Sequence, residues 1–158
     1  MKILRLDTQA CDVLRAQLAD LLRDAAPGTD AACAQRAWQD VRAAVAGGTR
    51  VLLAASQDGL LVGAVQLDLC QRPDEDHRAV IEALVVRARL RRRGIGGVLL
   101  RAAEAEAEAR ALGRTELRVA AQAGSGADAL FHDLGYACAG DSAGQVVYTK
   151  TLLMPEAA

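Results

Sequence analysis

The sequence predicts a single mixed α/β domain, in which a mostly antiparallel sheet of about six or seven strands is flanked by about four helices. Its length of 158 residues matches one ordinary domain. Its 52% hydrophobic and 25% charged residues are typical of a chain that folds around one core. Segments with the strand period and the helix period alternate without an internal repeat or a linker. We expect one domain over residues 1–153 and a frayed tail over 154–158.

Each element is predicted from its hydrophobic period and from the residues that stop it. Thr8 caps the first helix and Pro27–Gly28 ends it, while Gly47–Gly48 and Gly113 end two later helices. The predicted helices span residues 8–26, 30–46, 94–112 and 128–134. The predicted strands span residues 3–6, 51–55, 60–69, 79–86, 115–121, 136–138 and 145–152.

Three local patterns refine these elements. Asp58–Gly59 predicts a tight hairpin turn, because both positions favour a left-handed backbone. Gly63 in the following strand is expected to mark a β-bulge. In the long helix, Glu104, Glu106 and Glu108 are expected to lie on the solvated side.

Ring content and charge argue against nucleic acid as a partner. The chain has one Phe, two Tyr and one Trp, too few rings to stack on a single nucleic-acid strand. Its net charge of -1 gives no overall attraction for nucleic acid. The basic residues are nevertheless unevenly placed, and a cluster of arginines comprises Arg87, Arg89, Arg91, Arg92 and Arg93.

The cysteines and the N-terminal residues predict a compartment. The four cysteines form no C-x-x-C pair, and the two histidines lack metal-ligand spacing, so no metal site is expected. Arg5 and Asp7 interrupt any signal-peptide core. No apolar run approaches the roughly 18 residues of a membrane helix. We expect a cytoplasmic protein with reduced cysteines and no membrane association.

The stretch from Ile81 to Gly97 points to an anionic ligand. An apolar strand leads into the arginine cluster and then into a helix start with Gly94, Gly96 and Gly97. The first N–H groups of a helix are unpaired and together carry about half a positive charge. Glycines let phosphate oxygens approach these groups, and arginines add matching donors. A ligand that contains a pyrophosphate fits this segment.

Two common pyrophosphate loops do not match the spacing. A Walker loop ends in G-K-[ST], and no lysine follows these glycines. The dinucleotide fingerprint G-x-G-x-x-G needs glycine where Leu99 stands and an acidic residue where the chain has Ala120–Ala121. What remains is the pattern R-x-x-G-x-G, formed by Arg91, Gly94 and Gly96.

This pattern resembles motif A of the GCN5-related N-acetyltransferase (GNAT) superfamily. Residues 81–86 are similar to the family's fourth strand, and Arg91, Gly94 and Gly96 match its Arg/Gln, Gly and Gly/Ala positions. Residues 129–136 resemble the family's second conserved block, and the order of elements matches over nearly the whole chain. Within the superfamily, the two N-terminal helices are most similar to the tabtoxin-resistance-like branch.

The resemblance implies acetyl-CoA as the donor, with its pantetheine arm in a splay between the fourth and fifth strands. Backbone N–H groups from Arg92 to Gly97 would hold the pyrophosphate, and Leu84 to Val86 would pair with the arm like an added strand. The acetyl group would pass directly to an amine, and an N–H such as that of Val86 would polarise the thioester carbonyl. Many relatives dimerise, which makes a homodimer one expected assembly. The residues expected to bind the cofactor are Leu84, Val85, Val86, Arg91, Arg92, Arg93, Gly94, Ile95, Gly96, Gly97 and Phe131.

Two residues are candidates for proton transfer. Phe131 stands where the family usually has a tyrosine acid, and it has no hydroxyl to protonate the leaving thiolate. His132 is the neighbouring candidate, although adjacent helix residues point about 100° apart. Glu82 lies on the strand beside the expected thioester and is the candidate base. The acidic loop over residues 74–77 would attract a cationic substrate, or is a solvated turn.

Three functions remain open from the sequence. The first is an N-acetyltransferase that acts on a primary amine of a small molecule or peptide. The second is a non-catalytic CoA-binding or regulatory module. Phe131 favours this function, and so does Ala120, because the tabtoxin-resistance-like branch has an acidic residue at that position. The third is nucleic-acid or ribosome binding through the arginine cluster, which the low ring content argues against.

Overall fold

The computed structural model describes residues 1–25, 28, 30–69, 78–91, 93–109, 116–122, 127–142 and 145–151. Within them, seven strands form one sheet in the order β1-β2-β3-β4-β5-β7-β6. The strands are β1 (Lys2–Leu6), β2 (Arg50–Gln57), β3 (Leu60–Asp68), β4 (Arg78–Val86), β5 (Glu116–Gln122), β6 (Ala137–Ser142) and β7 (Gln145–Thr151). The helices are α1 (Thr8–Val13), α2 (Arg15–Ala25), α3 (Ala31–Ala46), the 3-10 helix η1 (Ala88–Leu90), α4 (Ile95–Ala109) and α5 (Ala127–Asp133). The predicted α/β fold is confirmed, and the predicted tail lies outside the described residues.

The sheet is antiparallel except at its centre, where β4 and β5 run parallel. A parallel pair needs a crossover connection, and α4 lies on that connection. The predicted hairpin turn between β2 and β3 is confirmed. Asp58 and Gly59 have φ of 53° and 79°, as a tight turn of this kind requires.

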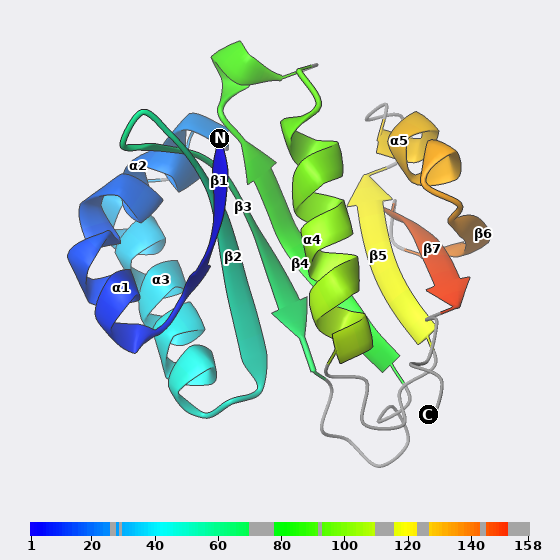
Figure 1. Cartoon of the computed structure of the whole chain (residues 1–158), viewed down its shortest axis with the longest axis horizontal. Coiled ribbons are helices and arrows are strands. Elements are labelled where there is room, and N and C mark those ends of the chain that lie inside the picture. The colour runs from blue at the N-terminus through cyan, green and yellow to red at the C-terminus, as the bar shows by residue number, and fades with distance from the viewer. Residues whose placement is uncertain are drawn as a thin grey trace.

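Helices cover both faces of the sheet (Figure 1). Along β2, Leu52 and Ala54 pack in one cluster with residues of α1, α2 and α3, whereas Leu53 and Ala55 pack in the other with residues of α4 and α5. This alternation follows from the two-residue period of a strand. The core is aliphatic, as the scarcity of rings predicts, and its largest fully buried side chains are leucines and valines.

Aspartates cap two of the helices. Asp7 Oδ1 accepts a hydrogen bond from Ala10 N–H at 2.8 Å, and Asp30 Oδ1 accepts one from Cys33 N–H at 2.7 Å. The bond from Cys33 holds the pKa of Asp30 below its usual value. The prediction that Thr8 is the first cap is wrong, because Thr8 already belongs to α1 and Asp7 holds the extended cap position.

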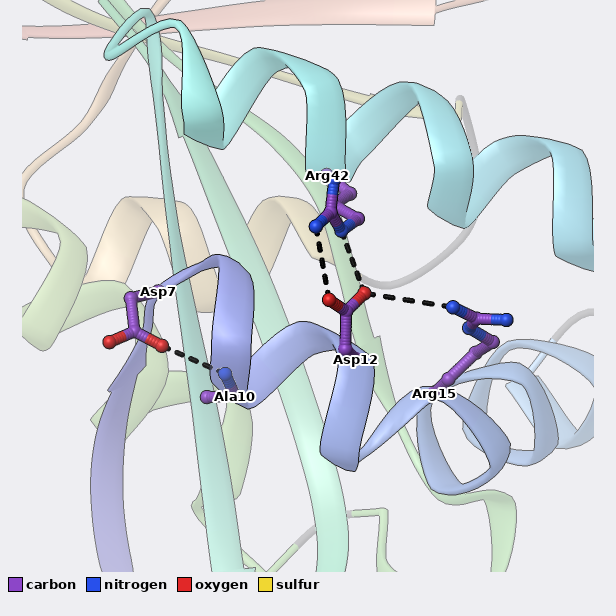
Figure 2. A network of polar contacts seen from close by, with 5 residues as sticks. All are labelled: Asp7, Ala10, Asp12, Arg15 and Arg42. Atoms are coloured by element: carbon purple, nitrogen blue, oxygen red, sulfur yellow. Dashed lines mark hydrogen bonds and ion pairs between the residues drawn. The ribbon is translucent and has the colours of Figure 1, made fainter.

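The predicted first helix is divided into α1 and α2 at Leu14, whose φ is -97° and ψ is 12°. One carboxylate bridges this break (Figure 2). Asp12 Oδ1 lies 2.7 Å from Arg42 Nε and Asp12 Oδ2 lies 3.0 Å from Arg42 Nη2, which joins α1 to α3. Arg15 of α2 lies 3.6 Å from Asp12. The three helices therefore share one ion-pair network, which we call the Asp12 network.

Substitution Asp12→Asn should cause a small, pH-dependent loss of thermal stability. Hydrogen bonds from Arg42 hold the pKa of Asp12 below its usual 3.8. A carboxyl with a lowered folded-state pKa stabilises the fold above its unfolded value, and this contribution is lost as the pH falls through the folded value. The gap between the melting temperatures of variant and wild type should therefore close below about pH 3.8. An equal gap in acid and at neutral pH would contradict this assignment.

Gly63 lies where α4 packs against the sheet. Ala55 of β2 pairs with Gly63, and the next pair skips one residue of β3, Val62. The bulge that the sequence predicts at Gly63 is therefore one residue earlier. A Cβ at Gly63 would lie 2.9 Å from Leu99 Cδ1 and 3.0 Å from Val85 O. The side-chain hydrogen of glycine is what lets α4 approach this closely.

Substitution Gly63→Ala should lower the free energy of unfolding by about 1–3 kcal/mol, because an added methyl group meets a backbone oxygen that cannot rotate away. Urea denaturation measures this loss. Gly47→Ala is the matched control, since Gly47 has φ of -77° and ψ of -6° and its Cβ would lie 3.5 Å from the nearest atom. Equal stability of both variants would show that α4 can shift away from β3.

Candidate active site

The centre of the sheet opens where β4 and β5 part (Figure 1). Their pairing covers Arg78–Ile81 with Glu116–Val119. Beyond these pairs, β4 continues to Val86 and β5 to Gln122. In this described part of the sheet, the two strand ends share no ladder, and we call this opening the β4–β5 splay. Extended backbone that has lost a neighbour can pair with an extended ligand.

A bulge in β4 adds to this separation. Val85 pairs with Ala64, but Glu82 pairs with Gln66, so residues 83 and 84 share one opposing residue of β3. A bulge bends its strand and increases the local twist. The bend falls within the part of β4 that has left β5.

Val86 presents its backbone N–H to the β4–β5 splay. Val86 pairs with Gly63, and the next N–H, that of Arg87, donates to Val62 O at 2.9 Å. Successive N–H groups of a strand point to opposite sides. The N–H of Val86 therefore faces away from β3, on the side of β5. This is the donor that the sequence predicts for polarising a carbonyl.

The start of α4 provides further backbone donors. Gly94 has φ of 82°, a conformation that favours glycine, and a Cβ there would meet no atom within 4 Å. The first helical hydrogen bond runs from Val98 N–H to Gly94 O at 3.1 Å. The amides of Ile95, Gly96 and Gly97 therefore belong to the unpaired first turn, where an anion binds well.

The structure brings several predicted site residues together. A Cβ on Gly96 would lie 3.9 Å from Val86 Cγ2 and 3.8 Å from Leu130 Cδ2. The end of β4, the first turn of α4 and α5 therefore meet at one place. Ile95 is 6% exposed and belongs to the hydrophobic core. Leu84 and Val86 pack on the α4 face of the sheet, and Val85 on the face of α1–α3.

The arginine cluster divides into inner and outer residues. Arg87 is buried, and its Nη1 lies 2.9 Å from Asp20 Oδ2. Arg89, Arg91 and Arg93 are exposed beside the start of α4. Arg92 lies outside the described residues. Part of the positive charge that the sequence places at this loop is thus neutralised inside the protein, while Arg89, Arg91 and Arg93 stay at the surface.

Glu82, the predicted base, is held by an arginine. It follows Ile81, the last residue of β4 that pairs with β5. Its carboxylate lies 3.2 Å from Arg50 Nη2, and Arg50 Nη1 donates to Gln66 Oε1 at 3.2 Å. Asp68 lies 3.7 Å from the same guanidinium. Glu82 is therefore fixed in orientation at the closed end of the β4–β5 splay while its side chain stays 42% exposed.

Phe131 is a core residue in this structure. It is 3% exposed, and its ring centroid lies 5.7 Å from that of Tyr136 and 5.1 Å from that of Tyr148. His132, the next residue, is exposed. The two side chains point in different directions, as adjacent helix positions do. The predicted ligand contact of Phe131 and the predicted proton transfer by His132 stay predictions.

A polar network joins α4 to the C-terminal strands. Tyr136 Oη donates to Glu104 Oε1 at 2.8 Å, and Lys150 Nζ lies 3.2 Å from Glu104 Oε2. Burial and the Glu104 charge raise the pKa of Tyr136. The prediction that Glu104 is solvated is wrong, because its side chain is 15% exposed and binds two partners. Glu104, Glu106 and Glu108 alternate along the helix, so their spacing did not indicate that Glu104 contacts the C-terminal strands.

The acidic loop over residues 74–77 lies outside the described residues. Among the residues that are described, no group of three or more His, Cys, Asp or Glu is placed to hold a metal ion. No helix in this part of the chain is long and apolar enough to cross a membrane.

The fold and the site together define a class. A sheet with a β4–β5 splay, beside a glycine-rich helix start, fits an extended ligand that carries a pyrophosphate. A family model with the description "Acetyltransferase (GNAT) family" matches residues 15–136 of this chain. The chain belongs to the GNAT acetyltransferase family, as the sequence motif predicts.

Solved structures agree with this fold. The aminoglycoside 6'-N-acetyltransferase from Enterococcus faecium is 19% identical, with 99% of this chain and 100% of that chain covered and a TM-score of 0.80. The PaiA N-acetyltransferase from Thermoplasma acidophilum, in complex with coenzyme A, is 15% identical, with 95% and 98% covered and a TM-score of 0.69. The ribosomal-protein-alanine N-acetyltransferase from Brucella melitensis is 20% identical, with 96% and 100% covered and a TM-score of 0.73. The tabtoxin-resistance-like branch stays a prediction.

Proposed function

We propose that this protein is an acetyl-CoA-dependent N-acetyltransferase that moves an acetyl group directly onto a primary amine of a small molecule or peptide. The observation that carries the proposal is the β4–β5 splay, which opens next to the first turn of α4. The structural relatives support it, since one of them holds coenzyme A and the others are named for amine-bearing acceptors.

The donor would be held mainly by backbone groups. The amides of Ile95, Gly96 and Gly97 face the pyrophosphate, and Arg91 and Arg93 add charge around it. The pantetheine arm lies along the free edge of β4 as an added strand. Binding through the backbone explains why the site needs glycine at its centre and tolerates a buried Ile95 side chain.

Transfer would proceed in one step on the bound thioester. The neutral amine attacks the carbonyl carbon, a C–N bond forms and the C–S bond breaks. The N–H of Val86 stabilises the negative charge that develops on the carbonyl oxygen. The nitrogen loses one proton to a base, and the departing thiolate gains one from solvent or from His132. Positioning of the two reactants supplies much of the rate.

Glu82 is the base, or the carboxylate that receives the ammonium, in this proposal. Glu82→Gln should lower kcat by about 10²-fold or more while the affinity for acetyl-CoA stays unchanged. Glu116→Gln is the matched control, because Glu116 also pairs with an arginine, Arg78 at 3.3 Å, and lies on the next strand. Steady-state kinetics measure both variants. Equal losses in kcat would remove Glu82 from the reaction.

Calorimetric titration with acetyl-CoA, followed by thiol release across a panel of amines, tests the function itself. We expect saturable binding and release above the uncatalysed rate with at least one amine. Absence of binding at millimolar donor would end the proposal.

A non-catalytic CoA-binding module is the second candidate. Phe131 favours it, because the ring lies in the core and offers no hydroxyl to the leaving thiolate. Tight binding of acetyl-CoA with no turnover of any amine in the same panel would select this function.

A further inference from the structure

Helix α2 has a row of polar side chains that faces the C-terminal end of β4. Gln17, Asp20 and Asp24 are spaced so that they share one side of the helix. Gln17 Oε1 accepts from Leu61 N–H at 3.0 Å. Asp20 Oδ2 accepts from Arg87 Nη1 at 2.9 Å. Together with Asp24, these residues tie α2 to the ends of β3 and β4.

Asp24 caps a helix to which it does not belong. The N-cap residue of η1 is Arg87, which makes no side-chain capping bond. Instead, Asp24 Oδ2 accepts from Ala88 N–H at 2.8 Å. A carboxylate on a backbone N–H is a charge-assisted bond, stronger than a neutral one. The first turn after β4 is therefore held by a residue of α2.

Arg87 completes this attachment from the strand side. Its backbone N–H donates to Val62 O at 2.9 Å, and its Nε donates to Leu61 O at 2.7 Å. The residue is 7% exposed. A guanidinium buried to this extent needs a counterion, and Asp20 is the carboxylate that the structure pairs with it. We call the contacts of Asp20 and Asp24 with Arg87 and Ala88 the α2 latch.

The α2 latch contacts the backbone between two parts of the proposed donor site, the end of β4 and the start of α4. Arg87 directly follows Val86, whose N–H faces the β4–β5 splay. Ala88 begins η1, which leads to Arg91 and Gly94. The backbone at 87 and 88 thus sets the direction in which β4 enters the pyrophosphate segment.

We propose that Asp20 and Asp24 are positioning residues for the donor, acting through Arg87 and Ala88. The proposal rests on acetyl-CoA binding at the proposed site. Without the α2 latch, the segment from Arg87 to Gly94 samples other conformations, and the donor must order it on binding. By linkage, a donor that binds the ordered segment also stabilises the attachment of α2.

The test measures acetyl-CoA affinity in variants of the α2 latch. Asp24→Ala removes the acceptor for Ala88 N–H and should raise Kd by about 3- to 10-fold, the worth of one hydrogen bond. Asp24→Asn keeps an oxygen acceptor and should stay close to wild type. Asp20→Asn is a second route, which removes the counterion of Arg87 and should also raise Kd.

A control separates positioning from general loss of stability. Asp12→Asn breaks the Asp12 network within the same helical layer without removing a latch contact, and should leave the Kd for acetyl-CoA unchanged. Hydrogen exchange provides a second readout. Acetyl-CoA should slow exchange of the amides of α2 in wild type and in Asp24→Asn, and this protection should be lost in Asp24→Ala.

The outcomes separate this inference from the proposed function. Suppose that wild type binds acetyl-CoA and that Asp24→Ala and Asp20→Asn bind it with an unchanged Kd. The positioning role of the α2 latch would then be overturned, and the proposed function would stand. A rise in Kd of the same size in Asp12→Asn would also overturn the positioning role, since stability would then explain the effect. Wild type that does not bind acetyl-CoA would overturn both.

Discussion

The parting of β4 from β5 after Ile81 is the constraint on which the site depends. Backbone N–H and C=O groups in a sheet need partners, and separating two central strands leaves those on the facing edges without a ladder. A bulge bends β4 where it has left β5, and α4 packs closely on β3 at Gly63. A ligand with an extended amide-bearing arm can replace the missing strand. The opening in the sheet and the unpaired first turn of α4 then act as one surface.

Arginine serves two physical purposes in this chain. Arg87 is buried and joins Leu61 O of β3 to Asp20 of α2, whereas the half-buried Arg50 lies against side chains of β3 and β4. Arg91 and Arg93 lie outside, where the same group suits phosphate oxygens. The division explains how a chain with a net charge of -1 presents local positive charge at α4. Under the function proposed above, the donor site also depends on α2 through Asp20, the carboxylate that pairs with Arg87.

Elements with a clear period were predictable, and so was the start of α4, because R-x-x-G-x-G is a short local pattern with a direct physical meaning. The hairpin at Asp58–Gly59 was predictable for the same reason. The break at Leu14 was not, because the buried residues Cys11, Leu18 and Leu21 keep helical spacing across it. Glu104 was misplaced, since its partners Tyr136 and Lys150 come from elements distant in the sequence. The bulge in β4 has no residue signature in the chain at all.

The sequence by itself determined the α/β class and the family and predicted the anion-binding segment, because periodicity, glycine and charge act over a few neighbouring residues. Only the tertiary structure decided which arginine is buried, where Glu82 points and how α2 meets the end of β4. Asp20 and Arg87 stand 67 residues apart, and their contact exists because the packing of α2 on β3 and β4 brings them together. Contacts of this kind depend on the whole arrangement of the layers, so no local pattern encodes them.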